Sequence, residues 1–186
     1  MRALVLAERQ PDIPLSELLA EKPDVVLCLG DLDGRSLRAL RNFGGPKLGV
    51  YGDRCRAAYF DTLQIADLHG QVWDVGGISF SGLEGAPRYK TVGDHLHGEE
   101  EAAATLAELP RTDVFIAHAP PFGINDEPAT LARRGYRALR AHLEAKPPAM
   151  LLHSHTEPAV PVVSVGGIEV RCVSGHAWVE LPAATA

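Results

Sequence analysis

The sequence predicts an α/β fold in which two mixed β-sheets pack together as a sandwich that is flanked by helices. Apolar runs of strand length alternate with amphipathic helical patterns, which is typical of parallel strands covered by helices. Two segments with the same VGGI centre, at 75–78 and 165–168, are predicted to add antiparallel hairpins. The chain has 186 residues, is 46% hydrophobic and has no low-complexity linker, so we expect one domain over 1–186.

Five apolar runs are predicted strands, because each has the length of a strand and is bounded by turn residues. In chain order they are RALVLA, DVVLCLG, PKLGVYG, DVFIAHAPP and PAMLLHSH. The VGGI segments are predicted hairpins because both central positions of the tight turn need a positive φ, which glycine adopts readily. The sheets are therefore expected to combine parallel and antiparallel strands.

Four helical patterns lie between these strands, and each buries one apolar face. They are PLSELLAE, GRSLRALRNF, HGEEEAAATLAELP and the segment that carries Tyr136, Leu139 and Leu143 before Pro147. Three consecutive glutamates open the third pattern, where the helix dipole favours acidic side chains, and Pro110 ends it.

The composition excludes several classes of partner. The net charge of -6 leaves no basic stripe, so we expect no binding to nucleic acid or to an anionic membrane surface. A small anionic substrate stays open, because a bound metal ion reverses the local field. The apolar stretch before Glu8 is too short for a secretory signal or a membrane span, and three scattered cysteines without a CxxC motif indicate reduced thiols. We therefore expect a cytoplasmic protein.

Carboxylates and imidazoles stand at the ends of the predicted parallel strands. They are Glu8, Asp31, Asp53, His118 and His153, with His155 just beyond. Ligands of open α/β sheets bind outside the carboxyl ends of the strands, so these side chains are expected to meet at one edge. Carboxylates gathered this closely repel one another, and bound divalent cations are the simplest way to stabilise them. The sequence therefore predicts a metal centre.

The same strand ends carry motifs that resemble those of the calcineurin-like metallophosphoesterases, and small prokaryotic members in particular. LGDLDG matches the GD motif, FIAHAPP the lone histidine, and LHSH the GHxH motif with Leu152 in place of its glycine. Two motifs are degenerate, because LVLAERQPD stands where the family has D-x-H and YGDRC where it has GNH followed by an acid. The resemblance covers nearly the whole chain and implies the sandwich fold with a two-metal site.

Carried over by position, the resemblance implies two metal sites that share Asp31. The first would comprise Glu8, Asp31, His155 and, as a weak neutral ligand in place of an imidazole, Gln10. The second would comprise Asp31, Asp53, His118 and His153. This mixture of carboxylates and imidazoles suits Mn, Fe or Zn, so we expect one or two divalent ions per chain.

Arg54 stands where the family has its catalytic histidine. A guanidinium can bind phosphoryl oxygens and stabilise developing charge, but it stays protonated and cannot donate a proton to a leaving group. Arg54 is therefore the candidate catalytic residue and a candidate for substrate binding. Arg88 is predicted either to clamp a phosphate or to form a surface salt bridge. His97, together with His95, is predicted either to contact a substrate phosphate or to be solvated around a helix start.

The resemblance implies a metal-dependent phosphoesterase that hydrolyses a small phosphomonoester or phosphodiester with a metal-activated hydroxide. The altered motifs leave two alternatives open. One is a catalytically weak or inactive scaffold of the same fold that binds a protein partner, and the other is a protein that binds a phosphorylated ligand without turnover. A homo-oligomer is also left open.

Overall fold

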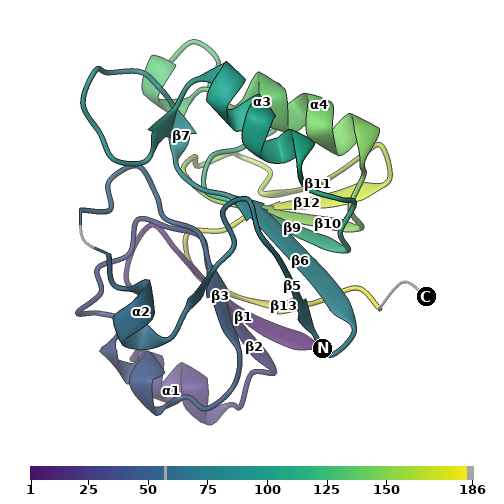
Figure 1. Ribbon diagram of the computed structural model, residues 1–186. Helices are drawn as coiled ribbons and strands as arrows, with labels where there is room; N and C mark the ends of the chain where they lie inside the picture. The colour runs from purple at the N-terminus through teal and green to yellow at the C-terminus, as the bar shows by residue number, and fades with distance from the viewer. Residues whose placement is uncertain (57, 184–186) are drawn as a thin grey trace.

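The computed structural model describes residues 1–56 and 58–183, and it shows two β-sheets that pack face to face with helices on both outer sides (Figure 1). The strands of the first sheet are β1 (Arg2–Ala7), β2 (Val25–Cys28), β3 (Lys47–Gly49), β4 (Ala66–Asp67) and β13 (Gly175–Glu180). Their spatial order is β13-β1-β2-β3-β4. The first four strands run parallel, and β13 lies antiparallel beside β1.

The strands of the second sheet are β5 (Val72–Val75), β6 (Ile78–Leu83), β9 (Val114–Ala117), β10 (Met150–His153), β11 (Val162–Val165) and β12 (Ile168–Cys172). Their spatial order is β11-β12-β10-β9-β6-β5, with four parallel central strands and an antiparallel strand at each edge. A small parallel ribbon joins β7 (Ala86–Pro87) to β8 (Leu96–His97). The predicted α/β sandwich of two mixed sheets is confirmed.

Helices cover the outer face of each sheet. The helical elements are α1 (Leu15–Ala20), the 3-10 turn η1 (Arg38–Asn42), α2 (Phe60–Leu63), α3 (Glu99–Ala107), the 3-10 turn η2 (Leu131–Arg133) and α4 (Arg137–Ala145). Figure 1 shows α3 and α4 over one face of the sandwich and α1 and α2 over the other. Among the described residues no helix has the length and apolar character needed to cross a bilayer.

The prediction of an α-helix over GRSLRALRNF is wrong, because the segment forms the five-residue 3-10 turn η1 instead. Leu37 and Leu40 are buried as predicted, and their spacing of three residues suits a 3-10 turn as well as an α-helix. The end of the turn is held by Lys47, whose Nζ donates to the carbonyl oxygens of Leu40 and Phe43 at 3.3 and 2.9 Å. A run this short between glycines does not offset the nucleation cost of an α-helix.

The core lies between the two sheets and follows the alternation of the strands. Val5 and Leu27 of the first sheet and Phe80 and Ile116 of the second are buried in this shared cluster. Neighbouring Leu4 points to the opposite face and joins the cluster under α1. Because both faces of the central strands are buried, those strands read as continuous apolar runs in the sequence.

Both VGGI hairpins are confirmed. Gly76 and Gly77 connect β5 to β6 with φ of 61° and 82°, and Gly166 and Gly167 connect β11 to β12 with φ of 59° and 83°. A positive φ at both central positions matches the right-handed twist of the paired strands. The VGGI repeat therefore marks the two antiparallel edges of the second sheet.

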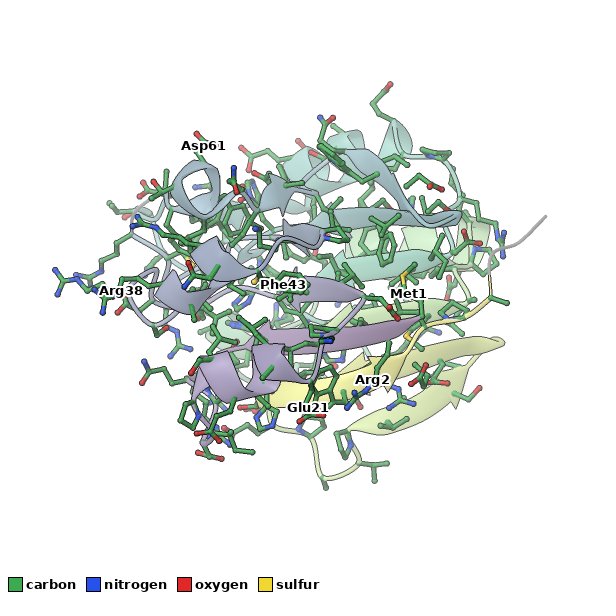
Figure 2. The ribbon with its side chains drawn as sticks, turned by 90° about the horizontal axis from the view of Figure 1, so that it is seen from below. Met1, Arg2, Glu21, Arg38, Phe43 and Asp61 are labelled. Atoms are coloured by element: carbon green, nitrogen blue, oxygen red, sulfur yellow. The ribbon has the colours of Figure 1, made fainter. Side chains whose placement is uncertain are left out.

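Two strands of the first sheet were not predicted, β4 and β13. The antiparallel register of β13 places Glu180 opposite Arg2, and the Arg2 guanidinium lies 3.7 Å from the centroid of the Trp178 ring. Arg2 also pairs with Glu21 beyond α1 at 2.8 Å, and Figure 2 shows these two side chains next to each other. These contacts tie the carboxyl-terminal strand to the first strand and the first helix.

Glycines bring the loops after β2 and β3 into close contact. Gly30 has a φ of 93°, and a Cβ on it would lie 2.5 Å from the backbone nitrogen of Gly52 and 2.8 Å from His118 Nδ1. A Cβ on Gly52 would lie 2.2 Å from Asp31 Oδ1. The glycines of the GD and YGD segments therefore leave the space that the Asp31 carboxylate occupies.

We expect Gly30→Ala to destabilise the fold by about 2–6 kcal/mol, because it combines overpacking with an unfavourable φ. Urea unfolding followed by circular dichroism measures this. Gly44→Ala is the matched control, since nothing lies within 4 Å of a Cβ at that position. A difference between the two variants below about 0.5 kcal/mol, the usual range of surface substitutions, would contradict the prediction.

Candidate metal centre

The candidate metal centre lies where strand ends of both sheets meet. Glu8 directly follows β1, and Asp31 and Asp53 lie in the loops after β2 and β3 of the first sheet. His118 directly follows β9 of the second sheet, and His155 lies just beyond β10. The backbone N–H of His155 donates to Glu8 Oε1 at 2.8 Å, although the two residues are 147 positions apart. The strand-end side chains therefore meet in space as expected.

The donor atoms are spaced like the ligands of a metal ion. One ligand atom from each of Glu8, Asp31, His118 and His155 lies within 4.8 Å of the other three. Asp53 joins them, because its Oδ1 lies 3.2 Å from His118 Nε2 and 3.3 Å from His155 Nδ1. Atoms bound to one tetrahedral zinc ion are about 3.4 Å apart. Glu8 and His155 were assigned to the first predicted site and His118 to the second. In the structure all three lie in one group of donor atoms, so the geometry does not separate the two predicted sites.

All three histidines have one ring nitrogen bonded to a backbone carbonyl. His118 Nδ1 donates to the carbonyl of Leu29 at 2.8 Å, His155 Nε2 to that of Ala132 at 2.5 Å, and His153 Nδ1 to that of Ser154 at 3.1 Å. A carbonyl only accepts, so in the neutral ring the other nitrogen carries a lone pair. In His118 and His155 that nitrogen faces Asp53. Metal-bound histidines are oriented in this way, so the donor set fits a divalent cation.

His153 lies to the side of the carboxylates. Its Nε2 is 3.4 Å from the Asn125 amide nitrogen, which can donate to the lone pair. Burial lowers the pKa of His153 to about 4, so the ring is neutral at physiological pH. A neutral imidazole is the form that binds a metal. A cation would therefore compete with Asn125 for this nitrogen.

The backbone is strained around the centre. Of the six described non-glycine residues with positive φ, four belong to it: Glu8 at 63°, Asp31 at 54°, Asn125 at 56° and His155 at 72°. Such a conformation costs of the order of 1–3 kcal/mol per residue and persists only where the surrounding structure imposes it. Strain of this kind is concentrated at functional sites, which favours a functional role for this edge.

Arg54 lies across the two carboxylates of the predicted first metal site. Its Nη2 is 2.6 Å from Glu8 Oε2, its Nε donates to Asp31 Oδ2, and its backbone N–H donates to Asp31 Oδ1 at 2.9 Å. The Arg54 side chain is 63% exposed, whereas the Asp31 side chain is 1% exposed. Burial alone would lower the pKa of Arg54, but its contacts with Asp31 and Glu8 raise it. The guanidinium thus supplies positive charge from the solvent side.

The carboxylates and His118 stabilise opposite charges on each other. Burial would raise the pKa of Asp53, but the hydrogen bond from His118 holds it well below its usual range. Burial would likewise lower the pKa of His118, but Asp53, Asp31 and Glu8 raise it. Asp53 is therefore anionic, and a cation that binds here displaces a proton from His118.

A cavity of about 360 Å³ opens beside the centre. Its lining includes Asp53, Arg54 and His155 together with residues that the sequence did not single out, namely Arg9, Tyr89, Arg133, Thr156 and Glu157. Tyr89 donates its hydroxyl to Asp53 Oδ2 at 2.8 Å. No periodicity or motif identifies Tyr89, because it lies in a loop. Ser154, which donates to the Leu29 carbonyl at 3.0 Å, could have been noted from its position inside LHSH.

Three predicted site residues lie elsewhere. Arg88 pairs with Glu101 at 2.9 Å, which is the surface salt bridge given as its alternative. His97 contacts Glu84 at 3.2 Å, so it is not a solvated loop residue, and like Arg88 it does not line the cavity. Gln10 is exposed and does not line the cavity. The positive φ of Glu8 turns the chain away before Gln10, so the alternation of the strand does not continue to that residue.

No family model and no curated relative matches the sequence, whereas solved structures match the fold. TT1561 of Thermus thermophilus matches with a TM-score of 0.68 and 15% identity, covering 93% of this chain and 88% of that one. A dimetal phosphatase from Danio rerio matches with a TM-score of 0.61 and 13% identity, covering 94% and 87%. Vps29 complexed with zinc from Entamoeba histolytica matches with a TM-score of 0.50 and 18% identity, covering 94% and 74%. This chain has the calcineurin-like metallophosphoesterase fold.

The metallophosphoesterase fold accounts for where the centre lies, because it brings the carboxyl ends of parallel strands from two sheets to one edge. The fold that the sequence resemblance implied is thus confirmed. At 13–18% identity the comparisons do not assign roles to residues, so the metal-binding roles of Glu8, Asp31, Asp53, His118, His153 and His155 stay predictions.

We expect Arg54→Gln to bind Mn²⁺ on the order of tenfold more tightly than the unmodified protein, a difference of about 1.4 kcal/mol. The reason is that the guanidinium and the cation compete for Glu8 and Asp31. Without metal the variant should unfold at a lower temperature, because two carboxylates lose their counter-charge. Calorimetric titration and thermal unfolding measure both effects.

Arg38→Gln is the control, because Arg38 is an exposed arginine on η1 that does not line the cavity, and Figure 2 shows it at the edge of the molecule. Equal or weaker Mn²⁺ affinity in Arg54→Gln would show that the guanidinium does not compete with a cation.

Proposed function

We propose that the chain is a metal-dependent phosphoesterase that hydrolyses a small phosphomonoester or phosphodiester. The observation that carries the proposal is the orientation of His118 and His155, each bonded to a backbone carbonyl on one side and facing Asp53 on the other. The carbonyl keeps a proton on one ring nitrogen, so when the other nitrogen gives up its proton to a binding cation, its lone pair is already directed at the carboxylates. The dimetal phosphatase from Danio rerio supports the proposal as a fold neighbour.

The residues proposed to hold one or two divalent cations, with manganese first among Mn, Fe and Zn, are Glu8, Asp31, Asp53, His118, His153 and His155. When bound, such cations lower the pKa of a water molecule to near neutrality and offset the charge of a phosphoryl group. Tyr89 orients Asp53 through its 2.8 Å hydrogen bond. Arg54, at the mouth of the cavity, is placed to hold phosphoryl oxygens through a bidentate contact.

The cavity lining contains three arginines and three acids, Glu8, Asp53 and Glu157, so it favours an anionic substrate once a bound cation offsets the acids. Besides Arg54, Arg9 and Arg133 line it, although Arg9 pairs with Asp12 at 2.9 Å and Arg133 with Glu127 at 2.8 Å. A phosphorylated ligand can exchange for these exposed carboxylates at little cost, because exposed ion pairs contribute about 0–1 kcal/mol. The substrate is therefore expected to be small and phosphorylated.

The proposed setting is the cytoplasm. All three cysteines are free, with Cys28 and Cys55 buried, as expected where thiols stay reduced.

A scaffold without turnover is the second candidate, and Arg54 is the observation that favours it. The guanidinium already satisfies Glu8 and Asp31, so this part of the centre is stable without a cation. In this case the chain would bind a protein partner or a second copy of itself.

Leaving-group dependence distinguishes the candidates. Arg54 cannot donate a proton, so the factor of roughly 10² to 10⁴ that general acid catalysis contributes should be missing. With Mn²⁺ we expect measurable hydrolysis of activated aryl phosphodiesters and much slower turnover of alkyl esters. Arg54→His should raise the rate on alkyl esters selectively, whereas Arg54→Ala should slow every ester. Steady-state kinetics on matched aryl and alkyl substrates measures these effects.

Asp31→Asn serves as the inactive control and Arg38→Gln as the unaffected one. If the Mn²⁺-loaded protein hydrolyses neither class and Arg54→His does not restore activity, the enzymatic proposal fails and the scaffold takes its place.

A further inference from the structure

A second group of metal-binding side chains lies outside the candidate metal centre. It comprises His69, Glu84 and His97, each of which offers a donor atom within 4.8 Å of the other two. His69 lies just beyond β4, Glu84 directly follows β6, and His97 ends β8. None of the three lines the cavity beside the candidate metal centre. The group thus joins three separate strand ends at another place.

The distances in this group are those of shared coordination. Glu84 Oε1 lies 3.2 Å from His97 Nε2 and 3.9 Å from His69 Nε2. A charge-assisted hydrogen bond from an imidazolium would be about 2.7–2.9 Å long, whereas two ligands of one tetrahedral zinc ion lie about 3.4 Å apart. His97 Nε2 thus forms a hydrogen bond at the long end of the usual range, whereas His69 Nε2 lies too far from the same oxygen for a hydrogen bond and at a separation nearer to that of two ligands of one ion.

The backbone fixes this arrangement. The N–H of Ala86 donates to the carbonyl of His95 at 3.1 Å, and the N–H of Arg88 donates to that of His97 at 3.0 Å. Gly85 has a φ of 66°, and a Cβ on it would lie 2.0 Å from the His95 carbonyl oxygen. The glycine therefore allows the strand that carries His97 to pack directly against the turn that carries Glu84, which orders the group before any ligand binds.

Glu84 is an anion whose side chain is mostly buried. Its side chain is 11% exposed, and those of His69 and His97 are 25% and 20% exposed. Burial would raise the pKa of Glu84, but contacts with His95 and His97 lower it to about 2. His95 Nδ1 lies 2.9 Å from the other oxygen, Glu84 Oε2, and pairs with it. A third imidazole nitrogen thus faces the same carboxylate.

One contact has to be given up when an ion binds. His69 Nδ1 accepts a hydrogen bond from the backbone N–H of Glu84 at 3.3 Å, which places the proton of the neutral ring on Nε2. Coordination through Nε2 requires that proton to move to Nδ1. At 3.3 Å the bond is longer than the usual range, so its loss is a small term beside a metal–nitrogen bond.

We propose that His69, Glu84 and His97 bind a divalent transition-metal ion. Zinc fits this donor set best, because two imidazoles and one carboxylate are a known tetrahedral zinc set that leaves a fourth position for water or His95. The ion would link β4, β6 and β8 and hold the β7–β8 ribbon against the sheet edge. This site is separate from the candidate metal centre and does not depend on its function.

The test uses the full chain carrying Asp31→Asn, which weakens the candidate metal centre. We expect this variant to bind one equivalent of zinc in a calorimetric titration, to show the visible absorption bands of tetrahedral cobalt with Co²⁺, and to unfold at a higher temperature in excess zinc. Adding His69→Gln or His97→Gln should weaken zinc binding by more than about 100-fold, since even outer-shell changes cost 10- to 100-fold. Glu84→Gln should do the same.

His176→Gln on β13 is the matched histidine control, and Glu100→Gln on α3 is the matched acid control. Circular dichroism shows whether each variant folds, and if Glu84→Gln does not fold, the variants of the two less buried histidines, His69 and His97, decide. The proposal is overturned if the Asp31→Asn chain binds no zinc, or if His69→Gln and His97→Gln leave its zinc affinity unchanged. Either result leaves the phosphoesterase assays unaffected, because those depend on Mn²⁺ at the other centre.

Discussion

The structure of the candidate metal centre, at the edge where the strand ends of the two sheets meet, depends on the need of buried carboxylates for positive charge. The side chains of Asp31 and Asp53 are 1% and 3% exposed, and Glu8 lies beside them. Burying charges this close together is unfavourable unless each is paired and hydrogen-bonded. Without a cation, the guanidinium of Arg54 and the raised pKa of His118 provide the compensation. The loops, glycines and strained residues around the centre serve to hold these groups at contact distance.

The fold supplies that rigidity through backbone groups. The carbonyl of Leu29, which directly follows β2 in the first sheet, accepts hydrogen bonds from both His118 and Ser154 of the second sheet. The two sheets are thus joined by hydrogen bonds at the edge where their charged side chains meet. The positive φ of Asp31 and His155 accompanies this arrangement, and aspartate and histidine adopt that conformation more readily than most residues other than glycine. Rigidity in the sandwich is therefore the source of the fixed donor geometry.

The strands could be predicted from periodic features of the sequence, whereas the geometry of the loops could not. The apolar runs predicted the parallel strands, and their final residues led directly to Asp31 and His118, because a strand end has a defined place in an α/β fold. The strand β13 was missed because GHAWVE has no strong alternation. Glu84 was missed because its role arises from Gly85 and the β7–β8 ribbon, which no local pattern marks. The contact between Arg54 and Glu8 likewise joins two loops and leaves no signal in either.

Arg54 replaces a cation beside Glu8 and Asp31 but not beside the histidines. This difference between the two parts of the centre favours metal binding over a permanently metal-free scaffold. A guanidinium donates hydrogen bonds to carboxylate oxygens, and it does so to Glu8 and Asp31. It makes no contact of this kind with His155, whose nitrogen lone pair is fixed toward Asp53 by the bond to the Ala132 carbonyl. A carboxylate flanked by oriented imidazoles can be matched by protons on those rings or by another acceptor of electron pairs, and a divalent transition-metal ion is such an acceptor. The centre therefore retains one half suited to an arginine and another half suited to a metal ion.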